Sequence, residues 1–280
     1  MPLLLNEFTD HTIDTGEVEI GYSVGPDSGP VLLLLHGVTS RRDGFLRVIE
    51  SLVDSYRIVT MDQRGHGYSG HTSGAYDRED HARDIRFVME NVCKDPTIVW
   101  GHSMGGGNSI AMANNAPSNL KALILEDPAA FGRQRPVRLD ANPTVNTFQV
   151  NLALIDAGLS IKEMAPKLQA ASPGQLEYFA VWKAECLLQM DAEILRGVVN
   201  GNYKGFDDPA AMLANIDVPV LLVQADPNAG GILPDDYLAS IVPSKEGFTT
   251  VKIPSAGHNI NREHPEQMLP IVIPWLVDQA

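Results

Sequence analysis

The sequence is poor in cysteine, has no long hydrophobic run and contains fewer basic than acidic residues. Cys93 and Cys186 are too few for a disulfide scaffold, and their spacing matches no zinc or redox motif. The apolar run Val31–Leu35 is too short to cross a bilayer, and the N-terminal residues lack the basic segment of a signal peptide. A net charge of −14 disfavours binding to phosphate backbones and to anionic lipid. We therefore expect a soluble, cytoplasmic protein with no nucleic-acid or membrane partner, and its oligomeric state is left open.

Strand-like segments recur along most of the chain. Several are short apolar runs, as a parallel sheet that is covered on both faces requires. These segments are Glu17–Tyr22, Val31–Leu35, Tyr56–Met61, Thr97–Trp100, Ala122–Leu125, Val220–Val223 and Thr249–Ile253. Amphipathic stretches such as Asp80–Val92 lie between some of them and have the spacing of helices. This alternation predicts an α/β fold, with a mostly parallel central sheet and helices on both faces.

The pattern changes between residues 131 and 215, where the apolar spacing becomes helical and no buried-strand signature appears. Ser172–Gln175 resembles a helix start, and Asp208–Pro209 resembles another. We therefore predict that residues 131–215 form a helical cap, inserted between a first core segment, 1–130, and a second, 216–280. Three arginines within residues 133–138 are either a clamp for a substrate carboxylate or part of a solvated loop.

One segment combines a strand, a sharp turn and a helix around a serine. Gly101–Gly105 (GHSMG) matches the pattern G-x-S-x-G, directly after the apolar segment Thr97–Trp100 and before a helix-like run. In this context Ser103 is predicted to be a nucleophile, because the turn exposes its hydroxyl and the helix N-terminus favours developing negative charge. His258 lies in a loop after the last predicted strand.

The sequence resembles the α/β-hydrolase superfamily, in the branch of capped serine hydrolases that includes esterases and lactonases. The matching motifs run in the family's order: His36–Gly37, Asp62–Ser69, Gly101–Gly106 and Gly257–Asn259. The resemblance implies an α/β-hydrolase fold with an inserted helical cap. It also implies that Ser103 is the nucleophile, that His258 is the base, and that the backbone N–H groups of Val38 and Met104 form the oxyanion hole.

The acid of the expected triad is less clear, because the sequence departs from the commonest family pattern. Most relatives have Gly-x-x-Asp after the strand that corresponds to Val220–Val223, but here Asn228 stands at the position of the aspartate. An asparagine cannot stabilise an imidazolium as a carboxylate does. Asp226 and Asp127 remain as candidates, and some lactonases and lipases of the superfamily have their acid at the position of Asp127. We prefer Asp127 and leave Asp226 open.

Together these residues predict a serine hydrolase that cleaves a carboxylic ester or lactone of a small, moderately apolar molecule through an acyl-enzyme. The triad would be Ser103, His258 and Asp127, and no cofactor or metal is expected. Two alternatives remain. The same triad also serves hydrolysis of amides or of C–C bonds, and some relatives with this fold act as small-molecule receptors.

Overall fold

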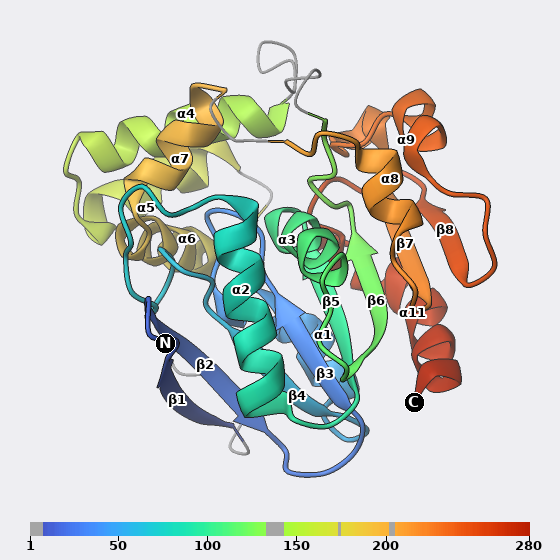
Figure 1. Ribbon diagram of the computed structural model, residues 1–280. Helices are drawn as coiled ribbons and strands as arrows, with labels where there is room; N and C mark the ends of the chain where they lie inside the picture. The colour runs from blue at the N-terminus through green and yellow to red at the C-terminus, as the bar shows by residue number, and fades with distance from the viewer. Residues whose placement is uncertain (1–7, 133–142, 173–174, 202–204) are drawn as a thin grey trace.

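A computed structural model describes residues 8–132, 143–172, 175–201 and 205–280. Within them, eight strands form one sheet with the order β1-β2-β4-β3-β5-β6-β7-β8 (Figure 1). Their bounds are β1 Thr9–Asp14, β2 Glu19–Gly25, β3 Val31–Leu35, β4 Arg57–Met61, β5 Thr97–His102, β6 Leu120–Glu126, β7 Val220–Ala225 and β8 Phe248–Ile253. β1 pairs with β2, and β2 with β4, in antiparallel fashion, whereas all pairs from β4 to β8 are parallel. The predicted mostly parallel sheet is confirmed.

The predicted strands are found where the apolar runs lie. β3 has the predicted bounds, and each of its side chains is buried, as expected of a strand covered on both faces. β1 was not predicted. It is an edge strand of sequence TDHTID whose side chains are almost all exposed, so burial imposes no apolar pattern on it.

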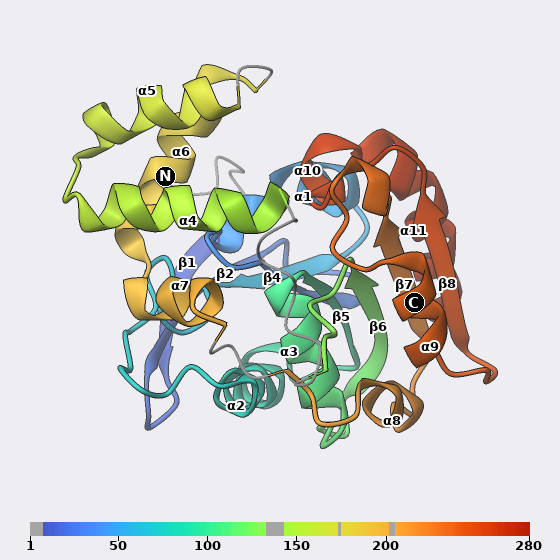
Figure 2. The same ribbon diagram turned by 90° about the horizontal axis from the view of Figure 1, so that it is seen from above.

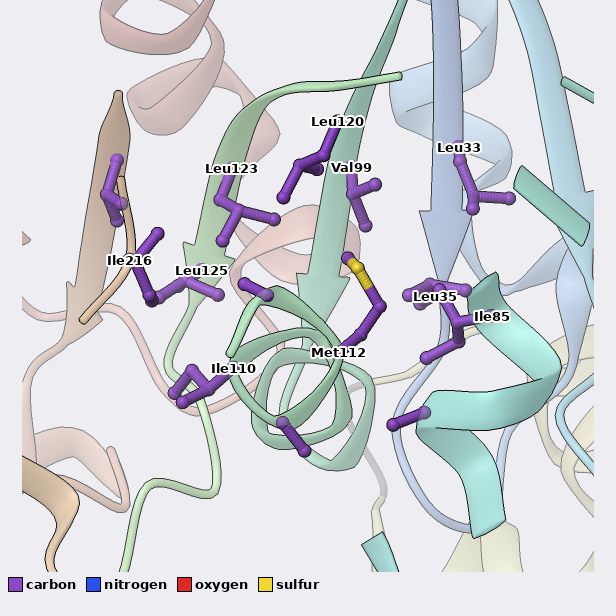
Figure 3. Packing of buried hydrophobic residues seen from close by; sticks show 14 of the residues in the cluster. Leu33, Leu35, Ile85, Val99, Ile110, Met112, Leu120, Leu123, Leu125 and Ile216 are labelled. Carbon is purple, nitrogen blue, oxygen red and sulfur yellow. The ribbon is translucent and has the colours of Figure 1, made fainter. Parts of the chain in front are cut away.

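Helices cover both faces of the sheet, as predicted. Around the core these are α1 (Leu46–Leu52), α2 (Arg78–Val88), α3 (Met104–Ala113), α8 (Pro209–Ala214), α9 (Asp235–Ile241), α10 (Ile260–Glu263) and α11 (Pro265–Gln279). Figure 3 shows one face, where Ile85 of α2 and Met112 of α3 pack with Leu35 and Val99 of the sheet. On the other face α1 and α11 bury their apolar side chains against Leu32 and Trp100, among others. The chain therefore has two hydrophobic layers, one on each side of the sheet.

The segment between β6 and β7 contains α4 (Pro143–Asp156), α5 (Ile161–Ala171), α6 (Glu177–Gln189) and α7 (Ala192–Val199). These helices gather above the carboxyl ends of the parallel strands and have an apolar cluster of their own (Figures 1 and 2). We call them the cap helices. The helix start predicted at Ser172 is wrong, because Ser172 is the C-cap of α5 and α6 begins only at Glu177.

Polar contacts attach the cap helices to the core. The guanidinium of Arg41, which is buried, donates to Glu185 at 2.9 Å and to Gln189 at 2.7 Å, both on α6. The indole N–H of Trp182, also on α6, donates to Asp43 at 2.7 Å. These bonds fix α6 over the edge of the sheet where its parallel strands end.

In the described part of the chain, no helix is both long and apolar enough to cross a membrane.

Candidate active site

Ser103 lies in the sharp turn between β5 and α3, with a φ of 54°. Positive φ is unusual for a residue with a side chain and is held here by the elements on either side. The neighbouring glycines are required by close packing. A Cβ on Gly105 would lie 2.2 Å from the carbonyl oxygen of Leu35, and one on Gly101 would lie 2.5 Å from that of Gly105. The glycines therefore let the turn sit against β3, and the side chain of Ser103 lines a cavity.

His258 reaches Ser103 from the loop that follows β8. Its Nε2 lies 2.8 Å from the hydroxyl oxygen of Ser103. His102 precedes the nucleophile, and its Nε2 lies 2.9 Å from the backbone carbonyl oxygen of His258. The centroids of the two imidazole rings are 4.8 Å apart. Burial lowers the pKa of His102 far below its usual value, so this ring is neutral and donates from Nε2. His102 thereby helps to hold the loop of His258 over the serine.

Asp127 accepts the other hydrogen bond of His258. Its Oδ2 lies 2.6 Å from Nδ1 of His258 and accepts from the backbone N–H of Ile232 at 2.9 Å. The residue follows β6 directly, has a φ of 35° and is completely buried. Asp127, His258 and Ser103 therefore form one continuous chain of hydrogen bonds.

Asp226, the other candidate, has a different environment. Its carboxylate accepts from the backbone N–H groups of Asn228 and Ser255, each at 3.0 Å. The bonds from Ser255 and Asn228 hold the pKa of Asp226 below its usual value. Asp226 thus anchors the loops after β7 and β8, and no hydrogen bond links it to His258 in the described residues.

The turn after β3 lies against the nucleophile. A Cβ on Gly37 would come 3.0 Å from Cβ of Ser103, and Val38 lines the same cavity as the serine. The ring of His36 braces this turn, because Nδ1–H donates to the carbonyl oxygen of Gly37 and Nε2 accepts from the N–H of Gln63. Burial lowers the pKa of His36 to about 4, which keeps the ring neutral for this pair of bonds. Met104 is the first residue of α3. The oxyanion-hole roles of Val38 and Met104 stay a prediction.

A cavity of about 370 Å³ lies between the core and the cap helices, with Ser103 and His258 in its wall. Phe148, Leu168 and Phe179 of the cap helices give it an apolar part. Two cationic side chains, Lys183 of α6 and Arg262 of α10, also line it. Sequence reasoning missed both, because they are far apart in the chain and belong to no motif. The three arginines of residues 133–138, which the sequence leaves as either a clamp or part of a solvated loop, lie outside the described residues.

Comparisons with known proteins agree with this architecture. A family described as "alpha/beta hydrolase fold" matches residues 30–159. A 2-(acetamidomethylene)succinate hydrolase of Mesorhizobium japonicum is 23% identical over 277 residues, which cover 93% of this chain and 92% of that protein. A monoacylglycerol lipase of Mycolicibacterium smegmatis is 27% identical over 281 residues, 94% of each chain. The solved structure of an N-formylmaleamic acid deformylase from Pseudomonas putida has a TM-score of 0.79 and 23% identity, covering 94% of this chain and 100% of that one. The predicted fold is confirmed.

Proposed function

The chain belongs to the α/β-hydrolase superfamily, and from this premise we propose that it is a serine hydrolase with the triad Ser103, His258 and Asp127. One observation carries the proposal: the unbroken series of hydrogen bonds from the buried carboxylate of Asp127, through both ring nitrogens of His258, to the hydroxyl of Ser103. This is the arrangement that an activated serine needs, with the base within hydrogen-bond distance and itself oriented by a third group.

The proposed reaction has two halves. His258 takes the hydroxyl proton through Nε2 while the oxygen of Ser103 attacks the substrate carbonyl carbon, and Asp127 stabilises the resulting imidazolium. The backbone N–H groups of Val38 and Met104 donate to the tetrahedral oxyanion. His258 then gives its proton to the leaving group as the carbonyl re-forms, leaving an acyl-enzyme. Water attacks this ester with His258 as the base, and the acid leaves with Ser103 restored.

For the substrate we propose a carboxylic ester or lactone of a small molecule. The cavity of about 370 Å³ limits the size of the substrate, because the cap helices cover the site. The name of the lipase from Mycolicibacterium smegmatis supports ester cleavage. An amide is the second candidate, and the name of the relative from Mesorhizobium japonicum, 2-(acetamidomethylene)succinate hydrolase, favours it.

Turnover of short 4-nitrophenyl esters, simple lactones and the corresponding anilides tests this proposal, with the unchanged chain and Ser103→Ala measured side by side. We expect multiple turnovers on at least one class, a pre-steady-state burst where deacylation is slow, and no turnover by Ser103→Ala. Binding of such compounds without turnover by the unchanged chain would contradict a hydrolase and favour a receptor.

A further inference from the structure

The cavity beside Ser103 contains two positive charges in a strongly acidic protein. Lys183 belongs to α6 of the cap helices and Arg262 to α10 of the core, and both side chains line this cavity. The chain as a whole has a net charge of −14. Positive charges in the wall of a cavity attract anionic ligands, and walls of low dielectric strengthen the effect.

Lys183 has no carboxylate partner in the described part of the chain. Its ammonium donates to the carbonyl oxygen of Thr39 at 2.6 Å and to the hydroxyl of Thr39 at 2.5 Å. An ammonium has three N–H donors, so these two contacts leave it one. Burial, and then the charge of Arg262, lower the pKa of Lys183 to about 7. A nearby anion would favour the charged form that this environment disfavours.

Arg262 is also without an ion-pair partner among the described residues. Its guanidinium lies over the rings of Phe179 and Trp182, 5.5 Å from each centroid, and donates to the side chain of Asn259. Its Nε–H is buried and has no acceptor in the described structure. Buried donors almost always have an acceptor, so the guanidinium keeps unused capacity for hydrogen bonds.

One acidic side chain also lines the cavity and could have neutralised these charges. Glu263 accepts instead from the side-chain amides of Asn259 at 3.2 Å and Gln175 at 3.5 Å, and it forms no ion pair with either cation. Neither cation therefore forms an ion pair with a described carboxylate, although the charge of Glu263 favours the charged form of Arg262.

On the basis of the proposed function, we propose that Lys183 and Arg262 form a subsite for a carboxylate, and that the natural substrate carries this carboxylate apart from the bond that Ser103 attacks. The planar fork of a guanidinium fits a carboxylate, and an ammonium in the same cavity adds a point charge. Since α6 belongs to the cap helices, the subsite also explains how the cap contributes to the choice of substrate.

A binding experiment tests the subsite without relying on catalysis. Calorimetry compares benzoate with benzamide, which has nearly the same shape and no charge, on the Ser103→Ala chain. Lys183→Met and Arg262→Gln are each added to this background. Lys162→Met is the matched control, because it also removes one positive charge from a cap helix but its side chain is exposed and outside the cavity. Since hydrogen bonds to charged groups contribute substantially, we expect benzoate to bind at least about tenfold more tightly than benzamide.

We expect each subsite substitution to remove most of this preference, and Lys162→Met to leave it intact. Equal binding of the two compounds, or a preference that survives both substitutions, would overturn the proposal. Where Lys183→Met does not fold, Lys183→Gln replaces it.

A pair of substrates, 4-acetoxybenzoate and its methyl ester, then separates the two proposals by kinetics in the catalytically active chain. A higher KM for the anion alone in Lys183→Met supports the subsite, whereas an equal loss on both esters shows that Lys183 only supports the turn at Thr39. Benzoate selectivity in a protein that hydrolyses nothing would refute the hydrolase and leave the subsite standing.

Discussion

Replacing Asp127 by asparagine should remove most of the activity while leaving a folded protein. The carboxylate accepts from Nδ1–H of His258 and from the N–H of Ile232 through the same oxygen. In Asp127→Asn, an amide oxygen in this place would carry no charge to stabilise the imidazolium. An NH2 group there would face the N–H of Ile232 and leave the proton of His258 on Nε2, which could then no longer accept the proton of Ser103. A wrong tautomer of this kind costs on the order of 10⁴ in kcat, which corresponds to about 5.5 kcal/mol of barrier.

Asp226→Asn is the matched control, because it makes the same change on the other candidate. Its carboxylate accepts two backbone N–H bonds, from Asn228 and Ser255, and an amide can accept only through its single oxygen. We expect a slightly lower free energy of unfolding and a largely preserved kcat. Turnover of a 4-nitrophenyl ester shows which variant keeps its activity, and thermal melts show whether both variants are folded. Loss of activity in Asp226→Asn with activity kept in Asp127→Asn would refute this assignment.

Three further predictions concern packing and charge. In Gly105→Ala the new Cβ would meet the backbone of Leu35, so a denaturant melt should show a free energy of unfolding lower by about 1–3 kcal/mol. Gly197→Ala has open space around it and should lose no stability. Equal losses in the two variants would contradict this reasoning. Burial raises the pKa of Glu126 to about 7, above its ordinary value of 4.5. Between pH 4.5 and 7 the unfolded chain loses this proton more readily than the folded one, so the free energy of unfolding falls as the pH rises. The stability of the unchanged chain relative to Glu126→Gln should therefore fall by on the order of 3 kcal/mol over this range, and parallel pH profiles would contradict the assignment. Affinity for benzoate should weaken as pH rises above about 7, where Lys183 loses its charge, and this pH-dependent weakening should be absent from Lys183→Met in the same titration.

The sequence was sufficient for the parts of the fold that burial determines. Val31–Leu35 was found with its correct bounds because both faces of β3 are covered and every position must be apolar. Thr9–Asp14 was missed because an exposed edge strand needs no such pattern. The helix predicted to begin at Ser172 failed because the same residues, Ser followed by Pro, also fit the end of the preceding helix.

The candidate site could be predicted only where its residues belong to a local motif. Ser103 stands out because a strand, a tight turn and a helix leave a clear pattern in adjacent residues. Asp127 and Asp226 could not be separated with confidence in the same way, since both follow neighbouring parallel strands and only the direction of each side chain distinguishes them. Lys183 and Arg262 meet through tertiary structure, so no spacing in the sequence indicates their cavity.

Labelling with a fluorophosphonate probe tests the central claim most directly, because an activated serine attacks the phosphorus of the probe and keeps a stable adduct. The unchanged chain, Ser103→Ala and Asp127→Asn would be incubated with the probe, and the added mass located by peptide mapping. We expect a single adduct on the peptide that contains Ser103, none in Ser103→Ala, and much slower labelling of Asp127→Asn. An adduct on another residue, or no adduct on the folded, unchanged chain, would contradict the account of Ser103 as an activated nucleophile.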